Sequence, residues 1–136
     1  MDEQKFSEEV RSRLKGFTGY CGIEFNEVGA EKCVISCRLR PELLNPTGIA
    51  HGGLIATLTD VAAGMMALQA DGWCHHVVTQ SCNIHFLSPG IGSGLSSESR
   101  VIRKGKRVCV VQVDCFTDVG KLCTTATYEV AYLSER

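Results

Sequence analysis

Positive charge, aromatic side chains and long apolar runs are all scarce in this 136-residue chain. The formal net charge is −1, and aromatic residues make up 7% of the sequence. A chain with no excess of positive charge has no general attraction to nucleic acid or to an anionic membrane, and so few rings offer little for bases to stack on. The longest apolar run, from Val61 to Leu68, is far too short to cross a bilayer. We therefore expect neither nucleic acid nor membrane as a partner.

The N-terminal sequence MDEQKFSEEVRSRLKGF is charged and lacks the hydrophobic region of a signal peptide. Residues 2–15 predict a short amphipathic helix with Phe6, Val10 and Leu14 on one face, which the glycines from Gly16 onward end. The chain contains no repeat, linker or low-complexity segment. We expect a single domain over residues 1–136 and a cytoplasmic location.

Cysteine is the one unusually common residue, with eight copies. Most of them stand singly in apolar, strand-like runs, where cysteine serves as a small buried hydrophobe. This group consists of Cys33, Cys37, Cys82, Cys109, Cys115 and Cys123. Without a secretory signal we expect reduced thiols. Cys74-His75-His76 has no second Cys/His pair at zinc spacing, so no metal site is predicted.

The chain predicts one long helix among strands. Residues 21–40 predict two strands around a turn near Gly29, residues 52–70 a helix, and roughly 75–87, 95–103, 107–118 and 122–133 four more strands. Connections of hairpin length imply antiparallel pairing. The predicted fold is therefore α+β, with one curved antiparallel sheet wrapped around one long central helix. A helix that is apolar on every side is expected to be enclosed.

Asp60 is the only ionisable residue of that helix. The positions three, four and seven residues away share its face, and they carry the small residues Gly53, Ala56, Thr57, Gly64 and Ala67. Either another backbone approaches this face closely or a ligand lies along it. Because an unpaired buried carboxylate costs several kcal/mol, Asp60 is a candidate functional group; the alternative is a hydrogen-bonded aspartate of the core.

His51-Gly52-Gly53 stands at the start of the helix. Backbone N–H groups of the first turn have no partner inside the helix and carry the positive end of its dipole. Glycine lets a ligand oxygen approach them closely, which suits the oxyanion of an acyl transfer. His51 and Asn45 are placed to orient a carbonyl group or a water molecule, although His51 is also suited to cap the turn.

Gly52 and Asp60 lie eight residues apart, which corresponds to about 12 Å along a helix axis. They cannot contact one reacting carbon atom within the same helix. Two copies related by a two-fold axis, with antiparallel helices, would bring Asp60 of one chain to Gly52 of the other. The spacing therefore predicts a homodimer with two shared active sites.

The assembled pattern N-x-x-G-x-x-H-G-G-x6-D, from Asn45 to Asp60, resembles the hotdog-fold acyl-CoA thioesterases of the phenylacetate-degradation (PaaI-like) family. The likeness continues through TQSCNIHFLSPG and VIRKGKRVCVVQVDC and covers roughly residues 15–133. It implies a hotdog fold and dimers that join their sheets edge to edge and assemble into a tetramer. It also implies an acyl-CoA substrate and no cofactor, since coenzyme A is part of the substrate.

The resemblance implies a role for each matching residue. Asp60 would be the general base or the nucleophile, and the Gly52 N–H would polarise the thioester carbonyl. Asn45 and His51 would be orienting groups, and Thr79 would supply a hydroxyl near the attacking water. The expected substrate-binding or CoA-binding residues are Gly53, Phe86, Arg103, Lys104, Gly105, Lys106 and Arg107.

Arg100 and the four cations of residues 103–107 put five positive charges into eight residues, a cluster suited to the phosphates of CoA. The alternative is a solvated hairpin turn.

Two other functions stay open. A hydratase or dehydratase of acyl thioesters needs an acid/base pair, and this helix offers Asp60 without an obvious second group on the same face. A non-catalytic acyl-CoA binder would have no need of a buried base. The acyl group also stays open, because Met65, Met66, Leu68 and Phe86 could surround either an arylacetyl group or a medium or long chain. A thioester on a carrier protein is a further alternative.

Overall fold

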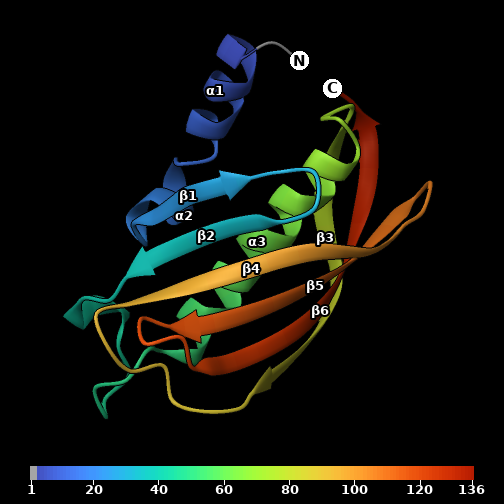
Figure 1. Ribbon diagram of the computed structural model, residues 1–136. Coiled ribbons are helices and arrows are strands. Elements are labelled where there is room, and N and C mark those ends of the chain that lie inside the picture. Colours follow the sequence, from blue (N-terminus) through green and yellow to red (C-terminus); the bar gives the residue numbers. More distant parts are fainter. Residues whose placement is uncertain (1–2) are drawn as a thin grey trace.

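The computed structural model describes residues 3–136 and contains one six-stranded antiparallel sheet that curves around one long helix (Figure 1). The strand order is β1-β2-β4-β5-β6-β3. The strands are β1 (Ile23–Val28), β2 (Cys33–Arg38), β3 (His75–Phe86), β4 (Gly94–Lys104), β5 (Val108–Thr117) and β6 (Leu122–Glu135). The helices are α1 (Glu3–Ser12), α2 (Gly16–Tyr20), the short 3-10 helix η1 (Pro41–Leu43) and α3 (Gly52–Ala70). The predicted architecture is confirmed.

Strands β2 and β5 alternate in burial along their length because one face of each packs on α3. Along β5 every second residue is buried, and Cys109, Val111 and Val113 are each 0% exposed. Five of the six cysteines expected in the core are indeed buried there. Cys82 is the exception and is exposed, because it lies on β3, a strand at the edge of the sheet. All eight cysteines are free thiols.

Side-chain hydroxyls of the sheet bind carbonyl groups of α3. The Tyr128 hydroxyl donates to the carbonyl oxygen of Ala56 at 3.2 Å and lies 2.7 Å from the hydroxyl of Thr59. Further along the helix, the Ser99 hydroxyl donates to the carbonyl oxygen of Ala62 at 2.9 Å. Burial raises the pKa of Tyr128 to about 12, so this phenol stays protonated at neutral pH. These bonds fix the rotation of α3 against the sheet.

The expectation that α3 is enclosed on all sides is wrong for a single protomer. The sheet covers one side of the helix, where Leu58, Ala62 and Met66 are 0% exposed, whereas Asp60 and Gly64 on the other side are only half-buried. By length and hydropathy alone α3 would also qualify as a membrane span, and 56% of its most apolar 18-residue stretch is buried inside the fold. It is the core helix of the sheet, with one side left open.

The N-terminal segment forms two helices where one was predicted. Asp2, the predicted first residue, lies outside the described residues, and α1 ends at Ser12. Gly16, with φ of +61°, changes the chain direction, and α2 begins at that residue instead of the helical structure ending there. Phe6 and Val10 of α1 pack against the core, as their spacing predicts.

A bulge in β3 reverses the direction of its side chains. Thr79 pairs with Val130, and Ser81 pairs with the next residue along β6, Glu129, so Gln80 is left over. Cross-strand partners share a face, and Val130 is buried whereas Glu129 is exposed. Thr79 therefore faces α3, and the strand after the bulge turns Ser81 outward. Strict alternation of side chains along the strand predicts Thr79 and Ser81 on the same face, and this prediction is wrong.

Because Leu58 is fully buried between α3 and the sheet, we expect Leu58→Ala to lower the free energy of unfolding by about 3 kcal/mol through lost apolar contact and a residual cavity. Urea denaturation measures this change. The matched control is Val119→Ala, at a side chain that is 84% exposed in the β5–β6 turn, with an expected effect within about 0.5 kcal/mol. Equal effects of the two substitutions would contradict this packing.

Candidate active site

His51 is the N-cap of α3. Its φ of −62° and ψ of 136° are extended, and its Nδ1 accepts a hydrogen bond from the Gly53 N–H at 2.8 Å. The N–H groups of Leu54 and Ile55 donate to the His51 carbonyl. Within residues 3–136 the Gly52 N–H has no acceptor. Of the two glycine N–H groups predicted to face a ligand, only that of Gly52 is therefore available.

Asn45 organises the loop that leads into α3. Its side-chain oxygen accepts hydrogen bonds from the Thr47 N–H at 3.0 Å, the Thr47 hydroxyl at 2.7 Å and the Ile49 N–H at 3.3 Å. Gly48 completes this turn with φ of +84°, a conformation that favours glycine. The Asn45 oxygen is thus occupied by the loop, which leaves the NH₂ group of its amide as the part free to orient a ligand.

The start of α3 opens into a hollow of about 380 Å³. Asn45, Gly52 and Phe86 all line it, together with apolar residues such as Ile55. The ring of Phe86 is 56% exposed, and its Cζ atom lies 3.6 Å from the point where a Cβ on Gly52 would be. The structure therefore brings three of the predicted site residues together around one available N–H group.

Asp60 lies in the middle of α3, on its open side. Its Oδ1 accepts a hydrogen bond of 2.5 Å from the Thr79 hydroxyl, which the bulge of β3 turns toward the helix. The carboxylate is half-buried, so the expectation of a buried one is wrong for the single protomer. It retains a hydrogen-bond donor on one side and access from the other, which a proton acceptor requires.

A second hollow, of about 290 Å³, lies beside Asp60. Its wall from α3 consists of Val61, Gly64, Met65 and Leu68, and β3 contributes Val77, Val78 and Thr79. No heavy atom lies within 4 Å of the point where a Cβ on Gly64 would be, so the small residue leaves open space. Met65 lines this hollow as predicted, whereas Met66 is buried in the core.

Arg13 and Thr18, from the N-terminal segment, also line the hollow beside Asp60. Neither residue was predicted from the sequence. No local pattern marks them, because they reach the helix only through the docking of α1 and α2 onto the domain. Burial and the nearby charge of Arg136 lower the pKa of Arg13, while Glu9 opposes this shift.

The two halves of the predicted site remain apart in one protomer. Gly52 and Asp60 line separate hollows and are eight residues apart on one straight stretch of helix, about 12 Å. The strand that carries Thr79 and Phe86, β3, lies at the edge of the sheet, and most of its residues are exposed. The geometry thus agrees with the argument that one chain alone does not assemble the site.

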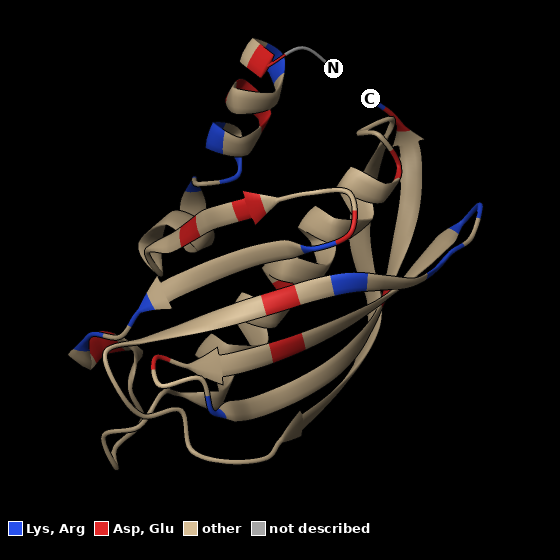
Figure 2. Cartoon of the chain, in the orientation of Figure 1, with Lys and Arg blue, Asp and Glu red and all other residues tan. Residues whose placement is uncertain are grey.

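The basic segment forms the hairpin between β4 and β5, and Figure 2 shows its positive charge at the projecting tip. Lys104 lies 3.6 Å from a carboxylate oxygen of Asp71. Arg103, Lys106 and Arg107 form no ion pair with any residue of the described chain, 3–136. The hairpin stands at the end of α3 opposite Gly52, so the structure does not bring it next to Gly52 within one protomer.

These features define a class of protein: a hotdog fold, with one helix in a curved sheet and a carboxylate halfway along that helix. The sequence profile of the thioesterase superfamily matches residues 47–124, which include His51, Asp60 and Thr79. This chain belongs to the thioesterase superfamily. The predicted class, a thioester hydrolase, is confirmed.

Several known proteins are similar to this chain along most of its length. SSO1253 of Saccharolobus solfataricus, named as an esterase, is 30% identical over 87% of this chain and 79% of its own. The medium/long-chain acyl-CoA thioesterase YigI of Escherichia coli is 24% identical over 84% of each chain. Among solved structures, the PaaI protein of the E. coli phenylacetic acid degradation operon superposes with a TM-score of 0.85 at 19% identity, covering 94% of this chain and 91% of PaaI.

A hypothetical thioesterase protein from Streptococcus pneumoniae, solved with coenzyme A, has the same fold. Its TM-score is 0.76 at 24% identity, and the match covers 84% of this chain and 90% of that one. At these identities the structural likeness establishes the fold.

The cap formed by His51 is testable through stability. We expect His51→Ala to lower the free energy of unfolding by about 1 kcal/mol, because the Gly53 N–H loses its acceptor. His51→Asn keeps a side-chain acceptor at the N-cap and is expected to stay close to wild type. Chemical denaturation of the three proteins makes the comparison, and equal losses for Ala and Asn would show that the cap is not what His51 contributes.

Proposed function

We propose that this protein is an acyl-CoA thioesterase in which Asp60 of one chain and the Gly52 N–H of a second chain act on the same thioester. The observation that carries the proposal is the half-buried Asp60 carboxylate, held by the Thr79 hydroxyl beside an open hollow on the core helix. The coenzyme A bound to the Streptococcus pneumoniae neighbour supports CoA as the thiol part of the substrate.

The proposed reaction needs one base and one oxyanion donor. Asp60 takes a proton from a water molecule whose oxygen attacks the carbonyl carbon; alternatively the Asp60 carboxylate attacks that carbon itself, and water hydrolyses the resulting anhydride after CoA has left. In both routes the Gly52 N–H stabilises the oxyanion that develops. The tetrahedral intermediate then collapses, its C–S bond breaks, and CoA leaves as the thiolate. The dipole of α3 adds to this stabilisation because its positive end lies at Gly52. No cofactor enters any of these steps.

The second chain is proposed to pair through the exposed edge of β3. A long unpaired edge strand is a template for further pairing, and pairing of two β3 edges would continue the sheet and turn the open sides of two α3 helices toward each other. Antiparallel helices then place each Asp60 near the partner's Gly52, and two such dimers would form the tetramer. The free thiols fit the reducing cytoplasm proposed as its location.

The acyl group is proposed to occupy the hollow beside Asp60. Its apolar wall from Val61, Met65, Leu68 and Val77 suits a hydrocarbon chain or an aryl ring. A medium or long chain is the class named for the YigI relatives, and an arylacetyl group is the class implied by the likeness to the phenylacetate-degradation enzymes.

Asp60→Asn is expected to lower kcat by a factor of about 100 to 10,000, because an amide cannot accept the proton. Thiol release from a panel of phenylacetyl-, hexanoyl- and palmitoyl-CoA measures the loss, with a blank for the protein's own thiols. Glu31→Gln, which removes a negative charge at an exposed site, is the matched control and should keep full activity. Undiminished turnover by Asp60→Asn, or hydration of crotonyl-CoA without thiol release, would contradict the proposal.

The shared site can be tested by mixing two inactive variants. Gly52→Pro removes the N–H at the first helical position, which accepts proline, and the extended conformation of His51 suits the residue before it. A hybrid of Gly52→Pro with Asp60→Asn contains one intact and one doubly impaired site. Random pairing at equal amounts should therefore restore about a quarter of wild-type activity.

Gly52→Ala is the control for the added side chain, because it keeps the N–H and is expected to stay active. Native mass spectrometry verifies that hybrid dimers have formed. An inactive mixture that contains hybrids would place both groups within one chain and rule out the shared site.

A further inference from the structure

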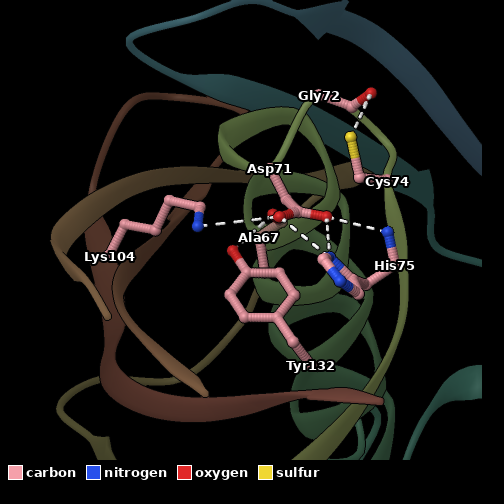
Figure 3. A network of polar contacts seen from close by, with 7 residues as sticks. All are labelled: Ala67, Asp71, Gly72, Cys74, His75, Lys104 and Tyr132. Atoms are coloured by element: carbon pink, nitrogen blue, oxygen red, sulfur yellow. Dashed lines mark hydrogen bonds and ion pairs between the residues drawn. The ribbon is translucent and has the colours of Figure 1, made fainter. Parts of the chain in front are cut away.

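Asp71 directly follows α3, and its carboxylate is nearly buried, with 7% of the side chain exposed. A negative charge at this point faces the negative end of the helix dipole, which disfavours it. Other groups must therefore stabilise Asp71. Figure 3 shows them converging on the carboxylate from the start of β3 and from the end of β4.

The partners of the Asp71 carboxylate come from two residues, His75 and Lys104, and Nδ1 of His75 lies within 3.2 Å of both carboxylate oxygens. Oδ2 accepts a hydrogen bond of 2.8 Å from the backbone N–H of His75 and lies 3.0 Å from Nδ1 of the same residue. Oδ1 lies 3.6 Å from Nζ of Lys104, the last residue of β4. Asp71 thus joins the beginning of β3 to the beginning of the basic hairpin.

Lys104 points back into the protein and not toward the hairpin tip. Its Nζ lies 4.8 Å from the centroid of the Tyr132 ring, a cation–π contact, and Figure 3 shows the lysine side chain reaching toward Asp71 on the same side as this ring. Tyr132 is itself fixed to α3, because its hydroxyl donates to the carbonyl oxygen of Ala67 at 2.8 Å. The charge of Lys104 is therefore neutralised and partly covered.

The rest of the hairpin is held by backbone bonds. The Gly105 N–H donates to the Val108 carbonyl at 2.8 Å, and a Cβ on residue 105 would lie 2.7 Å from that oxygen, so only glycine fits. The Tyr132 N–H donates to the Arg107 carbonyl at 2.9 Å. The hairpin is thus a fixed platform, and Arg103, Lys106 and Arg107 are its cations without an ion-pair partner in the described chain.

We propose that Asp71 and Lys104 are positioning residues, which lock the hairpin so that Arg103, Lys106 and Arg107 bind the phosphates of the CoA moiety. This inference rests on the proposed function. It gives Lys104 a role other than the CoA-binding one that the family resemblance implies. The positive charge of Lys104 is already balanced by the nearly buried carboxylate of Asp71, so it attracts a phosphate less strongly than a lysine without such a partner. Its pairing with Asp71 instead fixes the position where the hairpin begins.

The test compares two thioesters of one acyl group, hexanoyl-CoA and hexanoyl-pantetheine, which lacks the nucleotide and its phosphates. We expect Asp71→Asn and Lys104→Met each to raise KM for hexanoyl-CoA about fivefold with kcat unchanged, and the double variant to match either single one, because the pair acts as a unit. Neither substitution should change the kinetics with hexanoyl-pantetheine. Lys106→Met, which removes a phosphate-binding charge, should raise KM for hexanoyl-CoA alone.

The sign of the Asp71→Asn effect discriminates between positioning and simple electrostatics. Removing a negative charge near a phosphate site would by itself tighten binding, so a lower or unchanged KM would overturn the inference. If the increase in KM of the double variant equals the product of the two single increases, Lys104 acts independently of Asp71 as a direct phosphate ligand. This result would overturn the inference too. Lys121→Met, at an exposed lysine in the β5–β6 turn, controls for the loss of one positive charge.

Failure of the proposed function gives a different result. If the wild-type protein hydrolyses neither thioester, the thioesterase proposal fails, and the Kd of coenzyme A from titration calorimetry replaces KM in the same comparison. A fivefold weaker Kd for both single variants would then still support the positioning role. Absence of CoA binding to the wild type would overturn the inference as well.

Discussion

Helix α3 presents apolar or small side chains in every direction, and a single curved sheet covers only one side of it. Where the sheet packs, the burial is complete, and Leu58 and Met66 are 0% exposed. Hydroxyl groups of Tyr128 and Ser99 bind carbonyl oxygens of the helix and fix which side is covered. The side that remains open contains Asp60 and Gly64, so the incomplete covering of this helix is also what gives a ligand access to its carboxylate.

The same helix separates the two groups that the proposed chemistry needs. A first-turn N–H can serve an oxyanion only at the start of α3, whereas Asp60, the proposed base, stands more than two turns later. His51 caps one glycine N–H and leaves the other available, so the helix start is both stabilised and usable. A second chain, paired through the β3 edge, would cover the open side of the helix and, through the same interface, bring Asp60 near the partner's Gly52.

Two aspartates of this region differ in their surroundings and therefore in what they can do. Asp71 is almost buried and is held by a lysine, a histidine ring and a backbone N–H at the unfavourable end of the helix dipole. Its negative charge holds these partners together at the end of α3. Asp60 has a single hydroxyl partner and an open side, so it can exchange a proton without breaking an ion pair. Position along one helix thus separates a structural carboxylate from a candidate catalytic one.

The sequence by itself determined the elements, because periodicity and turn residues act locally. The bounds of α3, the turn near Gly29 and the approximate ranges of the four later strands all follow from neighbouring residues. The distance between Gly52 and Asp60 was equally fixed by the rise of a helix. These features can be predicted without knowing which surfaces of the protein pack together.

Tertiary structure decided what depends on long-range contact. The bulge at Gln80 shifts the register of β3 against β6, so that Thr79 faces Asp60 while Ser81 faces outward, and no local pattern marks an extra residue in a strand. The docking of α1 and α2 brought Arg13 to the hollow beside Asp60, and the pairing of Lys104 with Asp71 joined two residues that strand β3 and nearly all of β4 separate in the chain. Burial and charge pairing are properties of the folded surface, so they cannot be read from residues considered one segment at a time.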